Sequence, residues 1–463
     1  MTITALEQMS DAEVLAAARA LGLDPAGDLG RRDLIYEILE AQAASRSDTA
    51  DRGDRADRRR PVRLRRAIAD SWPEYMQSYD PARVTLEGLI QKVGVLELLP
   101  DGYGFLRSAE YSYLSSADDI YVSPSQIKRF SLRLGDTVDG QIRPPKEGER
   151  FFALLRVNTI NGRTPDLFTE RAGYDFLTPA YPNEQLRLEP PAGSGPDAVA
   201  ARLIDLVAPI GKGQRGLIVA PPRAGRTTLI EQIARALTAN YPAATLIVLL
   251  VDERPEEVTA IERALPGAEV VATTFDESPE RQVHVADLVL EKAKRLVEAG
   301  QDVVVLLDSI TRLARAHNGL TPAAGAEPRA PGGLDAAAVR GPKRLFGAAR
   351  AIEEGGSLTV IGTILVETGS AIDGAVFEEF AGTGNLEIRL RRDLASAGLF
   401  PAIDVAASET RREEMLVPPE PLAAVRALRA SVAGLAPAEA LAALLERIRA
   451  TDSNDELLSA DAR

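Results

Sequence analysis

The chain has 463 residues, with 54 Lys and Arg against 68 Asp and Glu, and its formal net charge of −14 argues against a surface uniformly adapted to nucleic acid. It contains no cysteine and only two histidines, which excludes disulfides, thiolate metal sites, cysteine nucleophiles and multi-histidine metal centres. Because no run of about 18 uncharged apolar residues occurs and residues 1–10 lack the features of a secretion signal, we expect a cytoplasmic protein of two or three domains without a membrane span.

The N-terminal region predicts a helical unit followed by a linker. Residues 5–43 place apolar side chains at helical spacing, with Ser10 as a start signal. We expect a docking or capping bundle over residues 1–45. Residues 46–66 hold nine arginines and four aspartates, a local charge of 9 − 4 = +5. This composition cannot bury a core, so residues 46–80 are expected to be a linker or insertion, and an RNA-attracting arm is the alternative.

The next region, residues 81–160, has the pattern of a small β-barrel. Short β-type runs are separated by Gly, Pro and Asp turns every 8–15 residues. The predicted strands are 84–90, 93–99, 119–122, 136–142 and 151–157. Five short strands at this spacing are typical of an OB-type barrel.

Inside this region lies an aromatic pair, Tyr103 and Phe105, with glycines around it and Arg107 after it. Residues two apart on a strand face the same side, so both rings should lie together, with the glycines leaving close access from the other face. Exposed rings beside an arginine suit a single-stranded nucleic acid, whose bases stack on them. The alternative is that the rings fill the barrel core. The glycines and the arginine favour the RNA-binding interpretation.

After a turn-rich connector at 161–200, strands and helices alternate through the domain expected at 201–463. The predicted strands are 216–220, 245–251, 269–273, 303–308 and 358–365, and the predicted helices are 228–239, 282–299 and 342–353. Apolar runs such as 303–307 show no alternation, so both faces of each strand should be covered. This pattern predicts a parallel α/β sheet with helices on both sides.

Residues 216–228 (GLIVAPPRAGRTT) predict a strand, a turn and a helix N-terminus, a joint that directs backbone N–H groups at an anion. The stretch follows the phosphate-binding P-loop pattern with two departures: Ala220 replaces the first glycine and Arg226 replaces the lysine. The hydroxyl of Thr227 is placed to ligate the Mg²⁺ of a nucleotide. A purely structural joint is the alternative for this stretch taken alone.

Asp308 ends the apolar strand at 303–307, at the carboxyl edge where open α/β sheets bind ligands. Four or more apolar residues followed by Asp form the Walker B arrangement, in which the carboxylate holds Mg²⁺ or its water. The alternative is a helix N-cap, a role that Ser309 could share. The P-loop pattern and Asp308 together are a much stronger indication of a nucleotide site than either one alone.

A second strand ends in an acidic cluster. Glu253 is the candidate base for the attacking water, and Asp252 could instead cap the turn. As the alternative, residues 255–257 are an ordinary helix start. Further along, Arg391 and Arg392 follow the strand predicted at 386–390. An arginine there could stabilise transition-state charge from a neighbouring subunit, and periodicity does not tell which one.

The chain resembles the family of bacterial transcription termination factor Rho. The stretches that carry the resemblance are 101–107, 119–127, 143–150, 210–222, 252–258, 307–316, 341–344 and 382–385. Together they span about residues 84–450, and residues 46–80 look like an insertion. The resemblance implies an α/β fold: a RecA-like P-loop ATPase core with an N-terminal helical unit and an OB-type RNA-binding barrel. It also implies a homohexameric ring, an RNA-dependent ATPase and 5′-to-3′ RNA/DNA helicase, with ATP and Mg²⁺ as cofactors.

The resemblance assigns roles to individual residues. Residues that match the primary site for pyrimidine-rich single-stranded RNA are Tyr103, Phe105, Arg107, Tyr121, Glu149 and Phe151. The implied ATP site comprises Pro222, Arg223, Ala224, Gly225, Arg226, Thr227, Thr228 and, stacked on adenine, Phe380, with Thr227 and Asp308 at Mg²⁺. The implied catalytic residues are Glu253 as water-activating carboxylate, Arg226, Arg254 and Arg392, the last as arginine finger. Residues matching the RNA-pulling pore loops are Gly332, Gly333 and Lys343. RNA polymerase and elongation factors are the implied partners.

Two departures bear on activity. Arg226 keeps the charge of the family's lysine but not its compact ammonium, so nucleotide binding should survive and turnover should slow. Residues 324–331 depart from the usual pore loop, with Pro328 at a basic position for which Arg329 could substitute. A catalytically weak, nucleotide-bound RNA-binding ring is therefore the second hypothesis. A rotary ATP synthase subunit, the third, does not account for the aromatic RNA patch.

Overall fold

A computed structural model of the chain describes residues 90–146, 149–165, 171–190, 197–320 and 333–461. The predicted N-terminal helical unit, the linker at 46–80, residues 84–89 of the first predicted strand and the pore segment 324–331 lie outside these residues. The chain divides into two compact units, described separately below. The second unit takes Ser108–Leu114, Leu134–Thr137 and everything from Ile160 onward, and the first takes the rest.

The first unit is a closed five-stranded barrel with the strand order β1-β2-β3-β5-β4. Its strands are β1 (Ile90–Leu98), β2 (Gly104–Arg107), β3 (Ile120–Val122), β4 (Thr137–Arg143) and β5 (Phe152–Ile160). Helix α5 (Pro124–Arg129) begins with a capping box between Ser123 and Gln126. The predicted barrel is confirmed. Strand β2 was not among the predicted strands, because a run of four residues is too short to show a pattern.

Gly104 lets β2 approach β1 closely. A Cβ atom at this position would lie 2.6 Å from the carbonyl oxygen of Glu97 and 2.7 Å from Leu96. The predicted role of this glycine, to leave access for a ligand, is therefore wrong: the space is taken by the neighbouring strand.

The second unit is built on a sheet with the order β14-β13-β7-β12-β10-β8-β9, and β11 and β6 pair beside β12. Its strands are β6 (Pro179–Ala180), β7 (Arg215–Ala220), β8 (Thr245–Glu253), β9 (Glu269–Thr274), β10 (Asp302–Asp308), β11 (Arg350–Ile352), β12 (Ser357–Leu365), β13 (Leu386–Arg389) and β14 (Glu409–Thr410). The six strands from β13 to β9 in this order are parallel. The predicted parallel sheet is confirmed.

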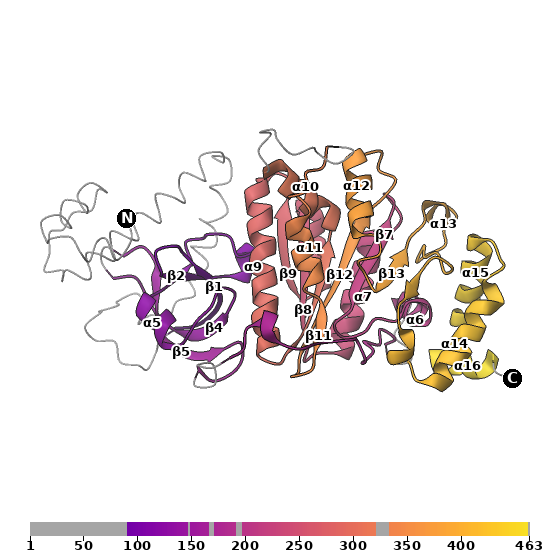
Figure 1. The fold of residues 1–463 in the computed structure, drawn as a ribbon, viewed down its shortest axis with the longest axis horizontal. Coiled ribbons are helices and arrows are strands. Elements are labelled where there is room, and N and C mark those ends of the chain that lie inside the picture. The colour runs from indigo at the N-terminus through magenta and orange to yellow at the C-terminus, as the bar shows by residue number, and fades with distance from the viewer. Residues whose placement is uncertain (1–89, 147–148, 166–170, 191–196, 321–332, 462–463) are drawn as a thin grey trace, which may run out of the picture. The chain divides into compact units, whose positions relative to one another are not determined.

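Helices pack around this sheet (Figure 1). They are α6 (Asp197–Val207), α7 (Arg226–Asn240), α8 (Pro255–Ala264), α9 (Pro279–Glu298), α10 (Ile310–Leu320), α11 (Arg340–Gly347), α12 (Ala371–Phe380), α13 (Arg392–Ser396), α14 (Pro419–Val432), α15 (Pro437–Arg449) and α16 (Asn454–Asp461), with 3₁₀ turns η3 (Ala109–Tyr111), η5 (Tyr174–Phe176) and η6 (Glu413–Met415). No helix among the described residues is long and apolar enough to cross a bilayer.

The apolar run of β10 explains how the sheet is covered. Val304 and Leu306 belong to the core that α6, α7 and the C-terminal helices complete. Val303, Val305 and Leu307 are equally buried and point to the opposite face, where α9 and α10 contact the strands. A strand with both faces buried shows no alternation, which is why this element was predicted with nearly correct bounds.

The helix predicted at 342–353 is wrong in its second half. Helix α11 ends at Gly347, and β11 follows and pairs antiparallel with β12. The turn between these strands contains Gly355 and Gly356, whose φ angles of 110° and 82° favour glycine. The apolar positions of β11 fit helical spacing by coincidence, and the glycine pair after it was the available signal for a hairpin.

Candidate functional site

The P-loop lies between β7 and α7. Gly225 takes a φ of +86° as N-cap of α7, and Arg223 takes a φ of +66°. The turn thus reverses the chain so that the first N–H groups of α7 face the edge of the sheet, an arrangement that binds phosphate. The other predicted ATP-binding positions lie in the same joint: Pro222, Ala224, Thr227 and Thr228. Ala224 is buried, whereas Arg223 and Thr228 are exposed.

Two of the predicted catalytic side chains, Arg226 and Glu253, meet the predicted metal ligand Asp308 at the carboxyl edge of the sheet. The Nε atom of Arg226 lies 3.1 Å from Oδ1 of Asp308, and its terminal nitrogen lies 3.7 Å from Oε2 of Glu253. Asp308 and Glu253 are almost fully buried. β8 and β10 are adjacent and parallel, so both carboxylates end at the same edge. Residues more than 50 positions apart in sequence are thereby brought together at the P-loop.

A bulge at the end of β8 separates the roles of the two acids there. The pairing of β8 with β9 shifts register between Leu250 and Glu253, and Asp252 has a φ of +58°. Such a bulge re-aims side chains. Glu253 is buried in the site, while Asp252 is partly exposed. This geometry favours Glu253 over Asp252 as the base.

Arg312 on α10 is a site residue that the sequence analysis missed. Its terminal nitrogen donates to Oε2 of Glu253 at 2.6 Å. Burial alone would lower the pKa of Arg312, but the Glu253 carboxylate raises it above its usual value. The available signal was its spacing: Arg312 follows Asp308 by four positions, on the helix that starts directly after the strand.

Glu257, in the first turn of α8, also belongs to this group of charges. Burial raises the pKa of the Glu257 carboxyl, and the neighbouring Glu253 carboxylate raises it further. Two carboxyl groups this close disfavour double ionisation. Glu257 was predicted only as part of a helix start, and the available signal for a further role was its position four residues after Glu253.

The residues present fit a divalent cation bound together with nucleotide phosphates. Oδ1 of Asp308 accepts a hydrogen bond from Thr363 at 2.9 Å, but its buried Oδ2 has no hydrogen-bond partner among the described residues. The Nε atom of Arg226 lies near Oδ1 of Asp308 but makes no hydrogen bond to that oxygen, because the N–H group is not directed at it. Among the described residues, no group of three or more histidine or acidic side chains has an arrangement that could hold a metal ion by itself. Mg²⁺ with few protein ligands, completed by phosphates and water, matches this donor set.

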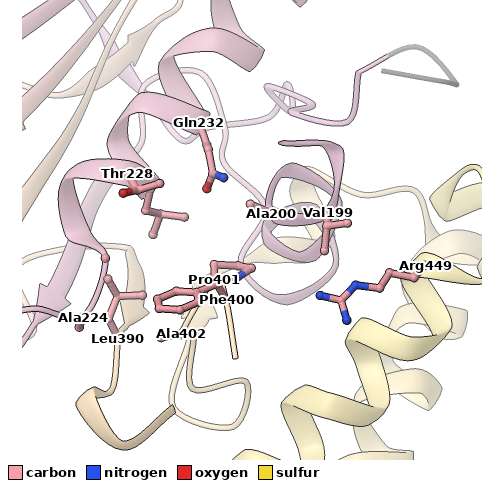
Figure 2. A pocket seen from close by; sticks show the side chains of 12 residues that line it. Val199, Ala200, Ala224, Thr228, Gln232, Leu390, Phe400, Pro401, Ala402 and Arg449 are labelled. Atoms are coloured by element: carbon pink, nitrogen blue, oxygen red, sulfur yellow. The ribbon is translucent and has the colours of Figure 1, made fainter. Parts of the chain in front are cut away.

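A cavity of about 300 Å³ continues from the P-loop toward the C-terminal helices (Figure 2). It is lined by Val199, Ala200, Ala224, Gly225, Thr228, Leu229, Gln232, Leu390, Phe400, Pro401, Ala402 and Arg449. The Phe400 side chain is 53% exposed, and its ring would lie 3.7 Å from a Cβ atom on Gly225. The ring therefore forms one wall beside the phosphate-binding turn.

The predicted adenine-stacking residue, Phe380, does not line this cavity. It is fully buried at the end of α12, where its ring packs against Phe346 with centroids 5.8 Å apart. The prediction of Phe380 is therefore wrong, because a ring without exposed surface cannot stack on a ligand. Phe400, after α13, is the aromatic residue in the right place. The sequence marks it only by a following proline.

Of the remaining predicted arginines and pore residues, Arg254 directly follows Glu253, and its backbone N–H donates to Oε1 of Glu253 at 3.2 Å. Arg254 and Arg392 are exposed at the starts of α8 and α13. Lys343 on α11 pairs with Glu379 of α12. Gly333 is described, with a φ of +84°, and Gly332 lies outside the described residues. Their roles remain predictions.

In the barrel, the predicted RNA-binding aromatic residues form one cluster. The ring centroids of Tyr103 and Phe105 are 5.9 Å apart, and that of Phe105 lies 6.2 Å from Tyr121 and 5.0 Å from Phe151. Tyr103 and Phe105 are only 2% and 4% exposed, so the expectation that these two rings are exposed is wrong. Tyr121 and Phe151 are partly exposed and form the accessible part of the cluster.

Two charged members of the predicted RNA site are already paired. Arg107 is buried, with Nε 2.6 Å from Glu97 and a second ion pair to Asp119. Burial raises the pKa of the Asp119 carboxyl even though Arg107 lowers it. Glu149 accepts two hydrogen bonds from Arg143 and one from the backbone N–H of Lys146. Burial alone would raise the pKa of the Glu149 carboxyl, but these hydrogen bonds outweigh burial and lower the pKa.

Comparisons with known proteins agree with both units. Residues 92–166 match the Rho termination factor, RNA-binding domain, and residues 200–410 match the ATP synthase alpha/beta family, nucleotide-binding domain. Curated proteins named transcription termination factor Rho are similar over nearly the whole length. The chain is 47% identical to the one from Buchnera aphidicola subsp. Schizaphis graminum, 48% to that from Pseudomonas aeruginosa and 46% to that from Escherichia coli, each over 98% of both chains.

Solved structures show where the second unit's fold recurs. A prototypical ATPase from the type III secretion system of pathogenic bacteria aligns with a TM-score of 0.51 and 25% identity, over 62% of this chain and 86% of that one. An ATP synthase subunit from Nanoarcheaum equitans aligns with a TM-score of 0.50 and 18% identity, over 61% and 77%, which shows the fold alone. The RecA-like core is confirmed. The comparisons do not support the alternative of a catalytically weak RNA-binding ring.

Proposed function

The chain belongs to the transcription termination factor Rho family, and we propose that it is an RNA-stimulated ATPase and 5′-to-3′ RNA/DNA helicase that translocates along nascent RNA to RNA polymerase. It is a transcription termination factor with an ATPase nucleotide-binding domain and an RNA-binding domain. The observation that carries the proposal is the meeting of Arg226, Glu253 and Asp308 beside the P-loop, in a chain that also contains an RNA-binding barrel.

The proposed chemistry assigns one task to each group. Backbone N–H groups of the P-loop and the Arg226 guanidinium hold the phosphates. Glu253 accepts a proton from the water that attacks the γ-phosphorus, and the bond to the bridging oxygen breaks to release ADP. Mg²⁺, held by Thr227 and Asp308, would neutralise developing charge. Arg312, a positioning residue, holds the Glu253 carboxylate in its orientation through the 2.6 Å contact.

Nucleotide binding should rearrange Arg226. Its guanidinium lies between the Glu253 and Asp308 carboxylates. Phosphates at the P-loop carry more negative charge and would draw it away, which frees Glu253 for water. Arg254 and Arg392, both exposed, are suited to reach a neighbour's nucleotide in a homohexameric ring, with Arg392 as the finger.

For RNA, we assign contact to the accessible part of the aromatic cluster. Tyr121 and Phe151 would stack on pyrimidine bases, and the buried rings of Tyr103 and Phe105 would support them from behind. Arg107 and Glu149 would hold the loops in place through their ion pairs. Lys343 and the glycines at 332 and 333 are the proposed pore contacts.

Phosphate release with and without poly(C) tests this function. We expect the rate of ATP hydrolysis by the purified chain to rise when poly(C) is added. If ATP binds but poly(C) leaves the rate at background, the RNA-stimulated motor is refuted.

A further inference from the structure

The cavity beside the P-loop has two long polar side chains at its far side. Gln232 lies one helical turn beyond Thr228 on α7, so both share the face that borders the cavity. Arg449 approaches from the last turn of α15 and is exposed. In Figure 2 the Gln232 amide and the Arg449 guanidinium extend toward the cavity from different sides, with the Phe400 ring between the P-loop and α15.

Arg449 lies beyond the segment that matches the nucleotide-binding domain. The match to the nucleotide-binding domain ends at residue 410, and α15 begins at Pro437. The α15 helix is nevertheless fixed to the same core: Leu441, Leu444 and Leu445 are buried together with residues of α6 and α7. The C-terminal helices therefore present Arg449 to the nucleotide site from a rigid support.

The size and lining of the cavity suit a nucleobase. A volume of about 300 Å³ is at the lower end for ligand pockets. A base stacked on Phe400, with its triphosphate at the P-loop, would turn its polar edge toward the far side of the cavity. Guanidinium groups donate to O6 and N7 of guanine, which are both acceptors, whereas a side-chain amide matches N6 and N7 of adenine, a donor and an acceptor.

We propose that Arg449 and Gln232 are the base-reading residues of this site: Arg449 recognises the acceptor edge of guanine nucleotides and Gln232 recognises adenine. The C-terminal helices thereby take part in selecting the nucleotide. This inference rests on the proposed function, because it assumes that the phosphates bind at the P-loop.

The test is competition for the full-length chain without RNA. A fluorescent ADP is bound to the wild type, to Arg449→Met and to Gln232→Met, and it is displaced with unlabelled ATP, GTP, ITP or 7-deaza-GTP. Methionine is chosen because its side chain is long and unbranched. We expect Arg449→Met to lower the affinity for GTP about fivefold and the affinity for ATP less than twofold. Gln232→Met should lower the affinity for ATP about fivefold and that for GTP less than twofold. ITP retains O6 and N7 and should follow GTP. 7-deaza-GTP lacks N7 and should lose most of its dependence on Arg449.

Arg447→Met is the matched control, since Arg447 lies on the same helix but does not line the cavity. It should leave the GTP-to-ATP affinity ratio unchanged. Equal weakening of GTP and ATP by Arg449→Met would overturn the inference, because it would mean that Arg449 only attracts phosphate charge. An unchanged ratio in both variants would overturn it as well. Failure of the wild type to bind fluorescent ADP would instead overturn the proposed function.

Discussion

The nucleotide site and the aromatic cluster of the barrel differ in how far their polar groups are satisfied. In the barrel, Arg107 is buried between two carboxylates, and Glu149 is paired with Arg143. At the P-loop, Oδ2 of Asp308 and Nε of Arg226 are buried without hydrogen-bond partners among the described residues. Both places were predicted as binding sites from the residue types present.

The presence or absence of hydrogen-bond partners indicates which polar groups can bind a ligand. A buried polar atom without a partner costs about 1–3 kcal/mol, so a site that contains such atoms gains stability when a ligand satisfies them. Groups that are already paired, like Arg107, would have to break ion pairs to bind RNA. The charged residues of the barrel are therefore expected to support the aromatic rings, and those of the nucleotide site to contact ligand.

Removal of the charge of Glu253 should produce the largest effect. In Glu253→Gln the side chain keeps its shape but can no longer accept a proton from water. We expect ATP turnover to fall by about 10²–10⁴ while fluorescent ADP still binds. Glu256→Gln, an adjacent exposed acid, is the control and should retain turnover. A loss of less than tenfold in Glu253→Gln would assign the base elsewhere.

The buried and the accessible rings of the aromatic cluster should respond differently to truncation. Because Phe105 is only 4% exposed, Phe105→Ala should lower the free energy of unfolding of the barrel by about 3–5 kcal/mol. Phe151→Ala, at a partly exposed ring, should instead weaken oligo(C) binding by about 1–3 kcal/mol.

Chemical denaturation and fluorescence anisotropy measure the two quantities. Val93→Ala, at a side chain that is 58% exposed on β1, should change neither one much. A Phe105→Ala variant of wild-type stability that no longer binds oligo(C) would restore the exposed-ring prediction.

The same contrast applies to the two phenylalanines proposed for adenine. Phe400→Ala should weaken ADP binding by about 1–3 kcal/mol, the range measured for stacking of one base on an aromatic ring. Phe380→Ala should leave ADP affinity close to the wild type in molecules that remain folded, and lower the melting temperature, because its ring packs on Phe346. Titration with fluorescent ADP, with melting curves for both variants, separates the cases. The opposite pattern would reinstate Phe380.

Much of the architecture could be predicted because burial on both faces leaves a direct trace in the sequence. β10 and β12 are apolar runs with both faces covered, and the P-loop and Asp308 follow at strand ends. Patterns of this kind depend on neighbours in sequence. β2 and β11 have four and three residues, too few for a periodicity to emerge.

Which aromatic or charged side chain is accessible could not be predicted, because exposure depends on packing between distant segments. Tyr103 and Phe105 lie on the same side of the chain, as predicted. That side is buried because Tyr121 and Phe151, from distant segments, pack against Phe105. Phe380 follows two glutamates and Phe400 precedes a proline, but neither sequence neighbourhood tells which ring is exposed, and only the fold separates them. Arg312, on the helix after β10, reaches Glu253 at the end of the neighbouring strand β8, a contact that spacing alone does not fix.

The smallest expected effect concerns Arg226 itself. Its guanidinium is a planar fork that contacts both Asp308 and Glu253, whereas a lysine ammonium is a compact charge that satisfies one partner at a time. In Arg226→Lys the lysine ammonium should therefore move from the carboxylates to the phosphates more readily. We expect RNA-stimulated turnover to rise several-fold, which corresponds to a decrease on the order of 1 kcal/mol in the activation barrier of ATP hydrolysis. Arg235→Lys, at an exposed arginine further along α7 that pairs with Glu231, is the control and should have little effect. Phosphate release at saturating ATP and poly(C) measures both. A lower rate in Arg226→Lys would mean that the fork is required in the transition state, and that the two carboxylates are arranged for arginine.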